Sequence, residues 1–388
     1  MPVLPRIAEF ADEIVAIRRD FHEHPEIGME EVRTSGIVAK LLRDWGVDDV
    51  HTGVGKTGVV GILKGRNGGN GKRIGLRADM DALPIDEKTN LPFASKTPGV
   101  MHACGHDAHT AMLLGAAKYL AETRDFDGTA VFIFQPAEEG LGGARAMLAD
   151  KLFDRFPCDE IYGMHNNPIG TPNAVGVKPG EAMAGADFFD FHVRGSGSHG
   201  AMPHKSKDPI VIATALVGAL QTIVSRNVPA VDTIVLSVTQ IHSGSAYNVI
   251  PSDATVSGTM RYFDTDVANL VRTRMRELAD GVGAAYGVDI VFENREIFDV
   301  LVNDDALSRT MMEIAKDVVG AENVSETPKV RMGSEDFADM LRVVPGAYCT
   351  VGHAGTIPLH NDGFILDENI LPVGASIYAR LVEVRTGA

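Results

Sequence analysis

The stretch MHACGHDAH, from Met101 to His109, places three histidines, a cysteine and an aspartate within nine residues. Thiolate and imidazole are ligands that zinc, cobalt, nickel and related metals use in proteins, so this crowding favours a transition-metal site. A polar loop with a buried cysteine is the simpler alternative for these residues alone. The rest of the chain decides between the two, because a catalytic metal site also needs further ligands, a base and a substrate pocket.

Outward from this stretch, the chain alternates between strand and helix patterns. Small and apolar residues recur at helical spacing from Ala108 to Tyr119, so the stretch leads into a helix. Strands are predicted at 57–64, 73–80, 129–136 and 160–165, and helices at 7–21, 31–45 and 143–153. This alternation predicts an α/β fold with a mixed sheet flanked by helices. Polar residues gather at strand ends, where open α/β sheets place their sites.

The pattern changes at about residue 183. ADFFDFHVRG, residues 186–195, alternates like a half-exposed strand. A helix at 209–224, strands at 233–241 and 254–263, a helix at 267–284 and a strand at 288–294 follow. This βαββαβ order predicts an inserted ferredoxin-like α+β domain over 183–294. The catalytic domain is then formed by 1–182 together with 295–388.

Length and composition indicate a soluble globular protein with more than one domain. The chain has 388 residues, of which 45% are hydrophobic and 23% charged. Its net charge of 36 − 52 = −16 argues against nucleic-acid or anionic-membrane partners. No run resembles a signal peptide or a transmembrane helix. Three sparse cysteines are unlike a disulfide framework, so we expect a cytoplasmic protein.

Further candidate ligands follow other predicted strands. A glutamate pair is usually a solvated edge, and an isolated histidine is usually structural, so each segment is weak by itself. The first three segments end successive βα units, whose ends a twisted sheet brings to one rim. The candidate ligand segments are Cys104 with His106, Glu138 with Glu139, His165, and His360.

Eight motifs in order carry a resemblance to a known family. They are HACGHD, QPAEEG, GMHNNP, GSGSHGAMPH, YNVIP, GTMRYFD, GSEDFA and PLHNDGF, and they span nearly the whole chain. In this order they resemble the metal-dependent aminoacylase–carboxypeptidase family. Within it they are similar to the branch of hippurate hydrolases, N-acyl-amino-acid amidohydrolases and auxin-conjugate hydrolases. The resemblance implies a di-metal catalytic domain and an inserted lid domain that forms a homodimer or homotetramer.

The resemblance also implies roles for particular residues in the catalytic domain. Glu138 is the expected general base, and its neighbour serves as a ligand because adjacent side chains at a strand end point in opposite directions. Asp81 either orients a metal-bound imidazole or caps the turn that follows it. Cys104 is a candidate bridge between two metals, since metals deprotonate a thiol. The implied metal ligands are Cys104, His106, Glu139, His165 and His360.

The inserted domain supplies a second implied group. His199 resembles a histidine that steadies the carbonyl oxygen in a neighbouring subunit's site, although a loop histidine bonded to its own turn is the alternative. Asn248 and Arg261 resemble residues that hold the substrate. A guanidinium suits a bidentate grip on a carboxylate, with a surface salt bridge as the alternative for Arg261.

These roles predict an amidohydrolase that cleaves N-acyl amino acids, such as hippurate or N-acetyl amino acids, to a carboxylic acid and a free amino acid. Metal-activated water attacks the amide, and Glu138 transfers the proton. Two divalent ions are expected, and zinc, manganese, cobalt and nickel each suit the ligand set. The alternatives are a peptidase acting on short peptides, a thiol hydrolase using Cys104 with His106 or His109, and a non-catalytic acyl-amino-acid binding protein.

Overall fold

The computed structural model describes residues 3–327 and 329–387, which form two compact units. The first unit takes in the chain up to Ala182, Leu301–Val330, and the chain from Asp336 onward. The second unit takes in Met183–Val300 and Arg331–Glu335. It runs past residue 294 because its last strand, β13 (Asp289–Phe298), continues beyond that point.

The first unit is built on an eight-stranded mixed sheet in the order β1-β2-β4-β3-β5-β16-β6-β15. Its strands are β1 (Asp49–Val54), β2 (Gly58–Lys64), β3 (Arg73–Asp79), β4 (Thr129–Gln135), β5 (Glu160–Asn167), β6 (Val175–Val177), β15 (Val324–Glu326) and β16 (Gly346–Gly352). The neighbours β4, β3, β5 and β16 run parallel to one another. Their carboxyl ends therefore meet at one edge of the sheet. The predicted α/β fold with a mixed sheet is confirmed.

Helices pack around this sheet. They are α1 (Pro5–Glu9), α2 (Ala11–Glu23), α3 (Val32–Asp44), α4 (His106–Thr123), α5 (Gly143–Ala149), α6 (Leu152–Arg155), α9 (Asp305–Val319), α10 (Phe337–Leu341) and α11 (Leu371–Thr386). The single helix predicted over 7–21 is wrong, because the chain leaves helical geometry at Phe10. Ile7 and Ile14 on either side of this break are buried in the same core. The helical spacing of apolar residues therefore continues across the break at Phe10, so the spacing alone could not predict the break.

The strand β3 shows how the sheet separates the core from the polar groups beneath the site. Ile74, Leu76 and Ala78 are buried in the main core, where α4 and α11 pack against each other and against this strand. Alternate residues of a strand point to opposite faces. Arg77 therefore lies on the other side, with its guanidinium 5.6 Å from the ring centre of Phe337 in α10.

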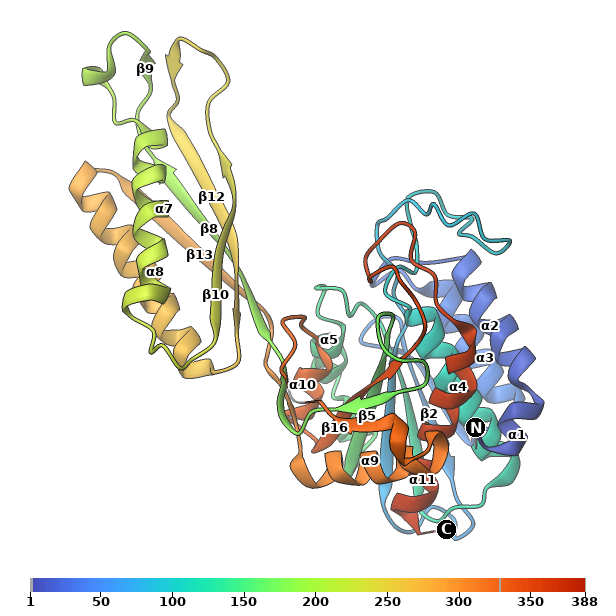
Figure 1. Cartoon of the computed structure of the whole chain (residues 1–388). Helices are drawn as coiled ribbons and strands as arrows, with labels where there is room; N and C mark the ends of the chain where they lie inside the picture. The colour runs from blue at the N-terminus through green and yellow to red at the C-terminus, as the bar shows by residue number, and fades with distance from the viewer. Residues whose placement is uncertain (1–2, 328, 388) are drawn as a thin grey trace. The chain divides into compact units, whose positions relative to one another are not determined.

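The second unit is an antiparallel sheet covered by two helices. Its strands, β8 (Gly185–Arg194), β10 (Ile234–His242), β12 (Asp253–Tyr262) and β13, lie in the order β10-β12-β8-β13. The helices α7 (Pro209–Arg226) and α8 (Thr265–Tyr286) lie side by side along the sheet (Figure 1). A short pair, β9 (Ser198–His199) and β11 (Val249–Ile250), lies outside this sheet. The observed order is the βαββαβ arrangement of a ferredoxin-like unit.

The helix α7 is long and apolar enough to cross a membrane by length and composition, so the expectation that no run reaches transmembrane length is wrong. Ile212, Leu216, Leu220 and Ile223 on one side of it are buried in the core of the second unit. Asp208 caps its first turn by accepting a hydrogen bond from the backbone N–H of Ile210 at 2.9 Å. The apolar character of α7 is therefore partly explained by its place as a core helix.

Candidate metal centre

The predicted ligand segments meet at the carboxyl edge of the parallel strands in the first unit. Cys104 and His106 lie at the start of α4, in the segment that follows β3, and the glutamate pair follows β4. His165 lies within β5, and His360 lies in the segment that follows β16. The order of the strands, β4-β3-β5-β16, places these four segments side by side.

A buried carboxylate holds His106 in one orientation. The imidazole Nδ1 of His106 lies 3.1 Å from Oδ1 of Asp81 and donates to it. The other oxygen of Asp81, Oδ2, accepts the backbone N–H of Glu139 at 3.0 Å. Asp81 thus connects His106 to Glu139, which lies 33 residues further along the chain. With its proton on Nδ1, His106 presents the lone pair of Nε2 as a metal ligand would.

The Nε2 atom of His106 faces both carboxylates of the glutamate pair. It lies 4.0 Å from Oε2 of Glu138 and 4.0 Å from Oε1 of Glu139. It is buried and has no hydrogen-bond partner among residues 3–327 and 329–387. A buried nitrogen without a partner is costly unless something else binds it. His106 and Glu139 could hold a metal ion, which would give this nitrogen a partner.

The two glutamates do not point in opposite directions, so the reason given for their different roles was wrong. The chain has left the strand at this point, and Ala137 has a positive φ of 53°. Both side chains turn toward His106 as a result. Their surroundings differ instead: Oε1 of Glu138 accepts the backbone N–H of Asp336 at 3.4 Å, while Oε1 of Glu139 lies 3.2 Å from Nε2 of His360.

Cys104 and His165 are the next pair of candidate metal ligands, and they lie beside each other. The sulfur of Cys104 lies 3.4 Å from Nε2 of His165. Nδ1 of His165 donates to the backbone carbonyl of Asn166 at 2.7 Å, so its Nε2 carries the free lone pair. Burial holds the pKa of His165 well below its usual value, which keeps the imidazole neutral and able to bind a metal.

The ligand atoms form overlapping groups. Within each group the atoms lie within 4.8 Å of one another. One group is Cys104, His106 and His165; another is Cys104, Glu139 and His360; a third is His106, Glu138 and Glu139. All five predicted ligands are therefore brought together, and Cys104 is shared by the first two groups. His106 and Glu139 are each shared by two of these groups as well, so the five residues could together hold two neighbouring metal ions.

The electrostatics of the group also suit cations. Burial lowers the pKa of His106, but Asp79 and Cys104 outweigh it, so the pKa lies well above its usual value. Hydrogen bonds to Cys104 and Glu139 raise the pKa of His360 to about 10. Burial raises the pKa of the Cys104 thiol. The site therefore stabilises positive charge, which divalent ions supply while displacing protons from the thiol and the imidazoles.

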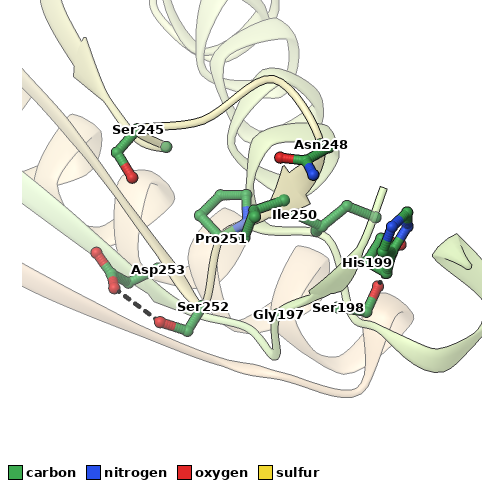
Figure 2. A pocket seen from close by; sticks show the side chains of 11 residues that line it. Gly197, Ser198, His199, Ser245, Asn248, Ile250, Pro251, Ser252 and Asp253 are labelled. Carbon is green, nitrogen blue, oxygen red and sulfur yellow. Dashed lines mark hydrogen bonds between the residues drawn. The ribbon is translucent and has the colours of Figure 1, made fainter. Parts of the chain in front are cut away.

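His199 and Asn248, both in the second unit, line an open pocket of about 670 Å³ (Figure 2). The Nδ1 atom of His199 accepts the backbone N–H of Ala201 at 3.0 Å. The bond to its own turn, which was the alternative reading, is thus present. It uses only one ring nitrogen and leaves Nε2–H as a donor. The carbonyl of Asn248 accepts the backbone N–H of Gly200 at 2.7 Å, which joins the two loops of this pocket.

Arg261 lies on β12 of the second unit and is half buried. Its guanidinium donates to the backbone carbonyl of Met260 at 3.1 Å and to the hydroxyl of Thr259. Within 3–327 and 329–387, no carboxylate forms a salt bridge with Arg261, so the surface ion pair considered from sequence is not seen there. Burial lowers the pKa of this guanidinium.

A buried network beneath the ligands was missed from the sequence. Arg77 donates to Oδ2 of Asp79 at 2.7 Å and to Oδ1 of Asp336 at 3.1 Å. The other oxygen of Asp79 accepts from Nδ1 of His109 at 2.6 Å. The signal available was the sequence RADMD at the end of a buried strand. A charged residue inside an apolar strand requires buried partners.

Comparison with known proteins gives consistent results. A family model described as peptidase family M20/M25/M40 matches residues 75–384. The hippurate hydrolase of Campylobacter jejuni is 41% identical over 98% of both chains, and the N-acetylcysteine deacetylase of Bacillus subtilis is 38% identical over 97% of both. The crystal structure of YxeP from Bacillus subtilis, a dinuclear metal-binding peptidase, is similar with a TM-score of 0.82. That chain is 35% identical, and the match covers 98% of this chain and 99% of the other.

These similarities confirm the resemblance drawn from the eight motifs, and with it the predicted class of enzyme, an amidohydrolase or metallopeptidase. The dinuclear centre of the similar structure agrees with the overlapping groups of ligand atoms found here.

Proposed function

This chain belongs to peptidase family M20/M25/M40, and from that premise we propose that it hydrolyses the amide bond of N-acyl amino acids to a carboxylic acid and a free amino acid. The observation that carries the proposal is the convergence of Cys104, His106, Glu139, His165 and His360 beside a further, buried carboxylate, Glu138. Two divalent ions held there would lower the pKa of a bound water and polarise the substrate carbonyl.

In this proposal Glu138 performs the proton transfers. It is 6% exposed, and one oxygen is held by the backbone of Asp336. The other oxygen is directed toward the ligand group, 4.0 Å from His106. Glu138 takes a proton from the attacking water and passes it to the departing amine, as a general base that becomes a general acid. Its neighbour Glu139 remains engaged with His360 as a ligand.

The inserted unit contributes the groups that hold the substrate. We assign His199 to the carbonyl oxygen in a neighbouring subunit's site, because its Nε2–H can donate to the negative charge that develops there. Arg261 binds the free carboxylate of the amino acid by a bidentate contact, and Asn248 donates to the substrate from the same unit. We further propose that this unit is a lid through which the chain forms a homodimer or homotetramer, and that the enzyme acts in the cytoplasm.

The substrate class rests on the relatives. Hippurate and N-acetyl amino acids are proposed as substrates because the relatives named for them are 41% and 38% identical over nearly the full chain. Short peptides are the alternative, since the family also includes peptidases. Zinc, manganese, cobalt and nickel each suit a site made of thiolate, imidazole and carboxylate, so the metal is left to experiment.

The test is a hydrolysis panel on metal-free protein reconstituted separately with each of the four metals. It compares hippurate, N-acetyl amino acids and unblocked dipeptides, each at several concentrations. We expect the acylated amino acids to give the highest kcat/KM, and Glu138→Gln to be inactive under the same conditions. A preference for dipeptides would replace the proposal with a peptidase. Binding of acylated amino acids without turnover by any metal form would replace it with a binding protein.

A further inference from the structure

Asn166 is a buried amide that touches two metal-ligand segments at once. Its Nδ2 donates to the backbone carbonyl of Cys104 at 2.6 Å. Its backbone carbonyl accepts from Nδ1 of His165 at 2.7 Å, which fixes that imidazole with Nε2 toward Cys104. The side chain is almost completely buried, with 1% exposed. Asn166 thus joins the start of α4 to the end of β5 directly behind the ligand atoms.

The orientation of this amide is fixed by a histidine on its far side. Nδ1 of His353 accepts the backbone N–H of Asp367 at 3.4 Å, so the ring proton lies on Nε2. That Nε2–H donates to Oδ1 of Asn166 at 3.2 Å. With its oxygen occupied in this way, Asn166 can only turn its NH₂ group toward Cys104. The amide assignment therefore follows from the hydrogen bonds on both sides.

The fit around Asn166 is tight. Gly105, between the ligands Cys104 and His106, has a φ of +89°, and a Cβ atom there would lie 2.4 Å from Nδ2 of Asn166. The amide therefore packs directly on the backbone that joins these two ligands. Any change in its length or hydrogen bonding is transmitted to that backbone.

Asn166 also connects the ligands to the proposed base. Its backbone N–H donates to Nε2 of His109 at 3.0 Å, so the proton of that ring lies on Nδ1, which donates to Asp79. Asp79 accepts from Arg77, and Arg77 donates to Asp336, whose N–H reaches Glu138. An unbroken series of buried hydrogen bonds thus runs beneath the site from Cys104 to Glu138. Such networks hold a unique arrangement when every member is satisfied.

We propose that Asn166 is a positioning residue for the metal centre: its amide holds the carbonyl of Cys104 so that Cys104 and His165 present their ligand atoms together. This inference rests on the proposed function only in taking the converging ligands to be a metal site. Outer groups of this kind commonly set metal affinity by about 10–100-fold. A purely structural role would instead lower stability and leave the affinity for metal unchanged.

The experiment measures metal binding rather than activity. Metal-free full-length protein is titrated with Co²⁺ against a chromophoric chelator, and the thiolate-to-cobalt absorption of Cys104 is recorded at equal occupancy. For Asn166→Ala we expect affinity to fall by about 10-fold or more, with a weaker thiolate band. His353→Phe, which removes the donor that orients the amide together with the acceptor for the backbone N–H of Asp367, should show a smaller loss in the same direction. His353→Gln keeps an N–H donor and should lie closer to the wild type.

The matched control is Asn303→Ala. Asn303 is equally buried at 2% exposed, and its amide also joins backbone groups, donating to Lys178 and Tyr348 carbonyls at 2.9 and 3.2 Å. It should lose thermal stability but keep the wild-type affinity for Co²⁺. Wild-type affinity and spectrum in Asn166→Ala, or an equal loss in Asn303→Ala, would overturn the proposal. If Asn166→Ala does not fold, the proposal is overturned when both His353 variants bind Co²⁺ with the wild-type affinity. A wild-type protein that binds no Co²⁺ would instead contradict the metal site itself.

Discussion

His106 and Asp81 form a buried hydrogen-bonded pair, in which Nδ1 of the imidazole lies 3.1 Å from Oδ1 of the carboxylate. Because Asp81 also accepts the backbone N–H of Glu139, both of its oxygens act as acceptors. One carboxylate therefore sets the direction of two proposed ligands. Buried partners of metal-bound imidazoles usually have this arrangement.

The first prediction concerns Asp81→Asn. An amide offers one acceptor and one donor, so either His106 or the backbone of Glu139 must face an NH₂ group. We expect metal affinity to fall by about 10–100-fold, with much of the activity regained at high metal concentration. Metal titrations in competition with a chelator, together with kcat at saturating metal, measure this. Unchanged affinity would assign Asp81 to the turn alone.

The second prediction separates the adjacent glutamates. Glu138→Gln should lower kcat by about 10²–10⁴-fold because it removes the proton acceptor, yet two metals should remain bound. Glu139→Gln should instead lose metal, because the carboxylate beside His106 and His360 is the proposed ligand. Elemental analysis and kcat on the same preparations test both. The assignment fails if Glu138→Gln retains near wild-type turnover or if the two variants lose metal equally.

The third prediction distinguishes metal from thiol catalysis. Cys104 is 6% exposed, and burial raises the pKa of its thiol, so a free thiolate nucleophile is disfavoured. Removing metal with a chelator should abolish activity, and added metal should restore it. Brief treatment of the metal-loaded enzyme with iodoacetamide should leave activity intact. The thiol hydrolase hypothesis requires the reverse pattern, with inactivation by alkylation and indifference to the chelator.

The part of the site that sequence predicted well consists of short motifs at strand ends. His165 in GMHNNP and His360 in PLHNDGF are ordinary residues by themselves. They became ligand candidates because the ordered motifs resemble a family and because parallel strands share one edge. The parallel pairing of β3 with β4 and β5 is what brings these motifs together.

The network beneath the site could not be predicted in the same way. Arg77 and Asp336 are 259 residues apart in the chain, and Asn166 meets Cys104 across 62 residues. No periodicity or spacing encodes such contacts, because they depend on which strands become neighbours. The positive φ of Ala137 was equally hidden, and the two glutamates beside it both face His106 instead of pointing in opposite directions.

The fourth prediction tests the grip on the substrate. Arg261→Ala should lower kcat/KM for an N-acyl amino acid by about 10–100-fold, since a charge-assisted contact to a carboxylate is lost. For the methyl ester of the same substrate, kcat/KM should be similar in the variant and the wild type. Arg295→Ala is the control, because Arg295 lies on β13 of the same sheet, with β8 between it and the strand of Arg261, and pairs with Asp190 instead. Equal loss on acid and ester would contradict a carboxylate contact.

The last prediction concerns stability and pH at a carboxylate outside the ligand set. Glu160, 6% exposed, accepts from Lys72 at 2.5 Å, from Nε of Arg385 at 2.7 Å and from the hydroxyl of Tyr162 at 2.9 Å. Burial raises its pKa, but these partners outweigh burial, so the pKa is lowered in the folded state. A carboxyl whose pKa is lowered by folding stabilises the folded protein at pH values above its pKa in the unfolded chain, near 4.3. This stabilisation is lost as the pH falls through the pKa of the folded state.

Glu160→Gln should therefore destabilise the protein at pH 7 by about 1–3 kcal/mol, and the difference from the wild type should shrink as the pH falls below about 4. Urea unfolding of both proteins, with a chelator present so that metal loss does not contribute, measures the difference at each pH. Asp159→Asn is the matched control: its pair with Arg73 is about 40% exposed on both sides, so its contribution should stay within about 1 kcal/mol. A Glu160→Gln difference that stayed constant from pH 7 to pH 3 would show that packing, rather than the charge on Glu160, provides the stability.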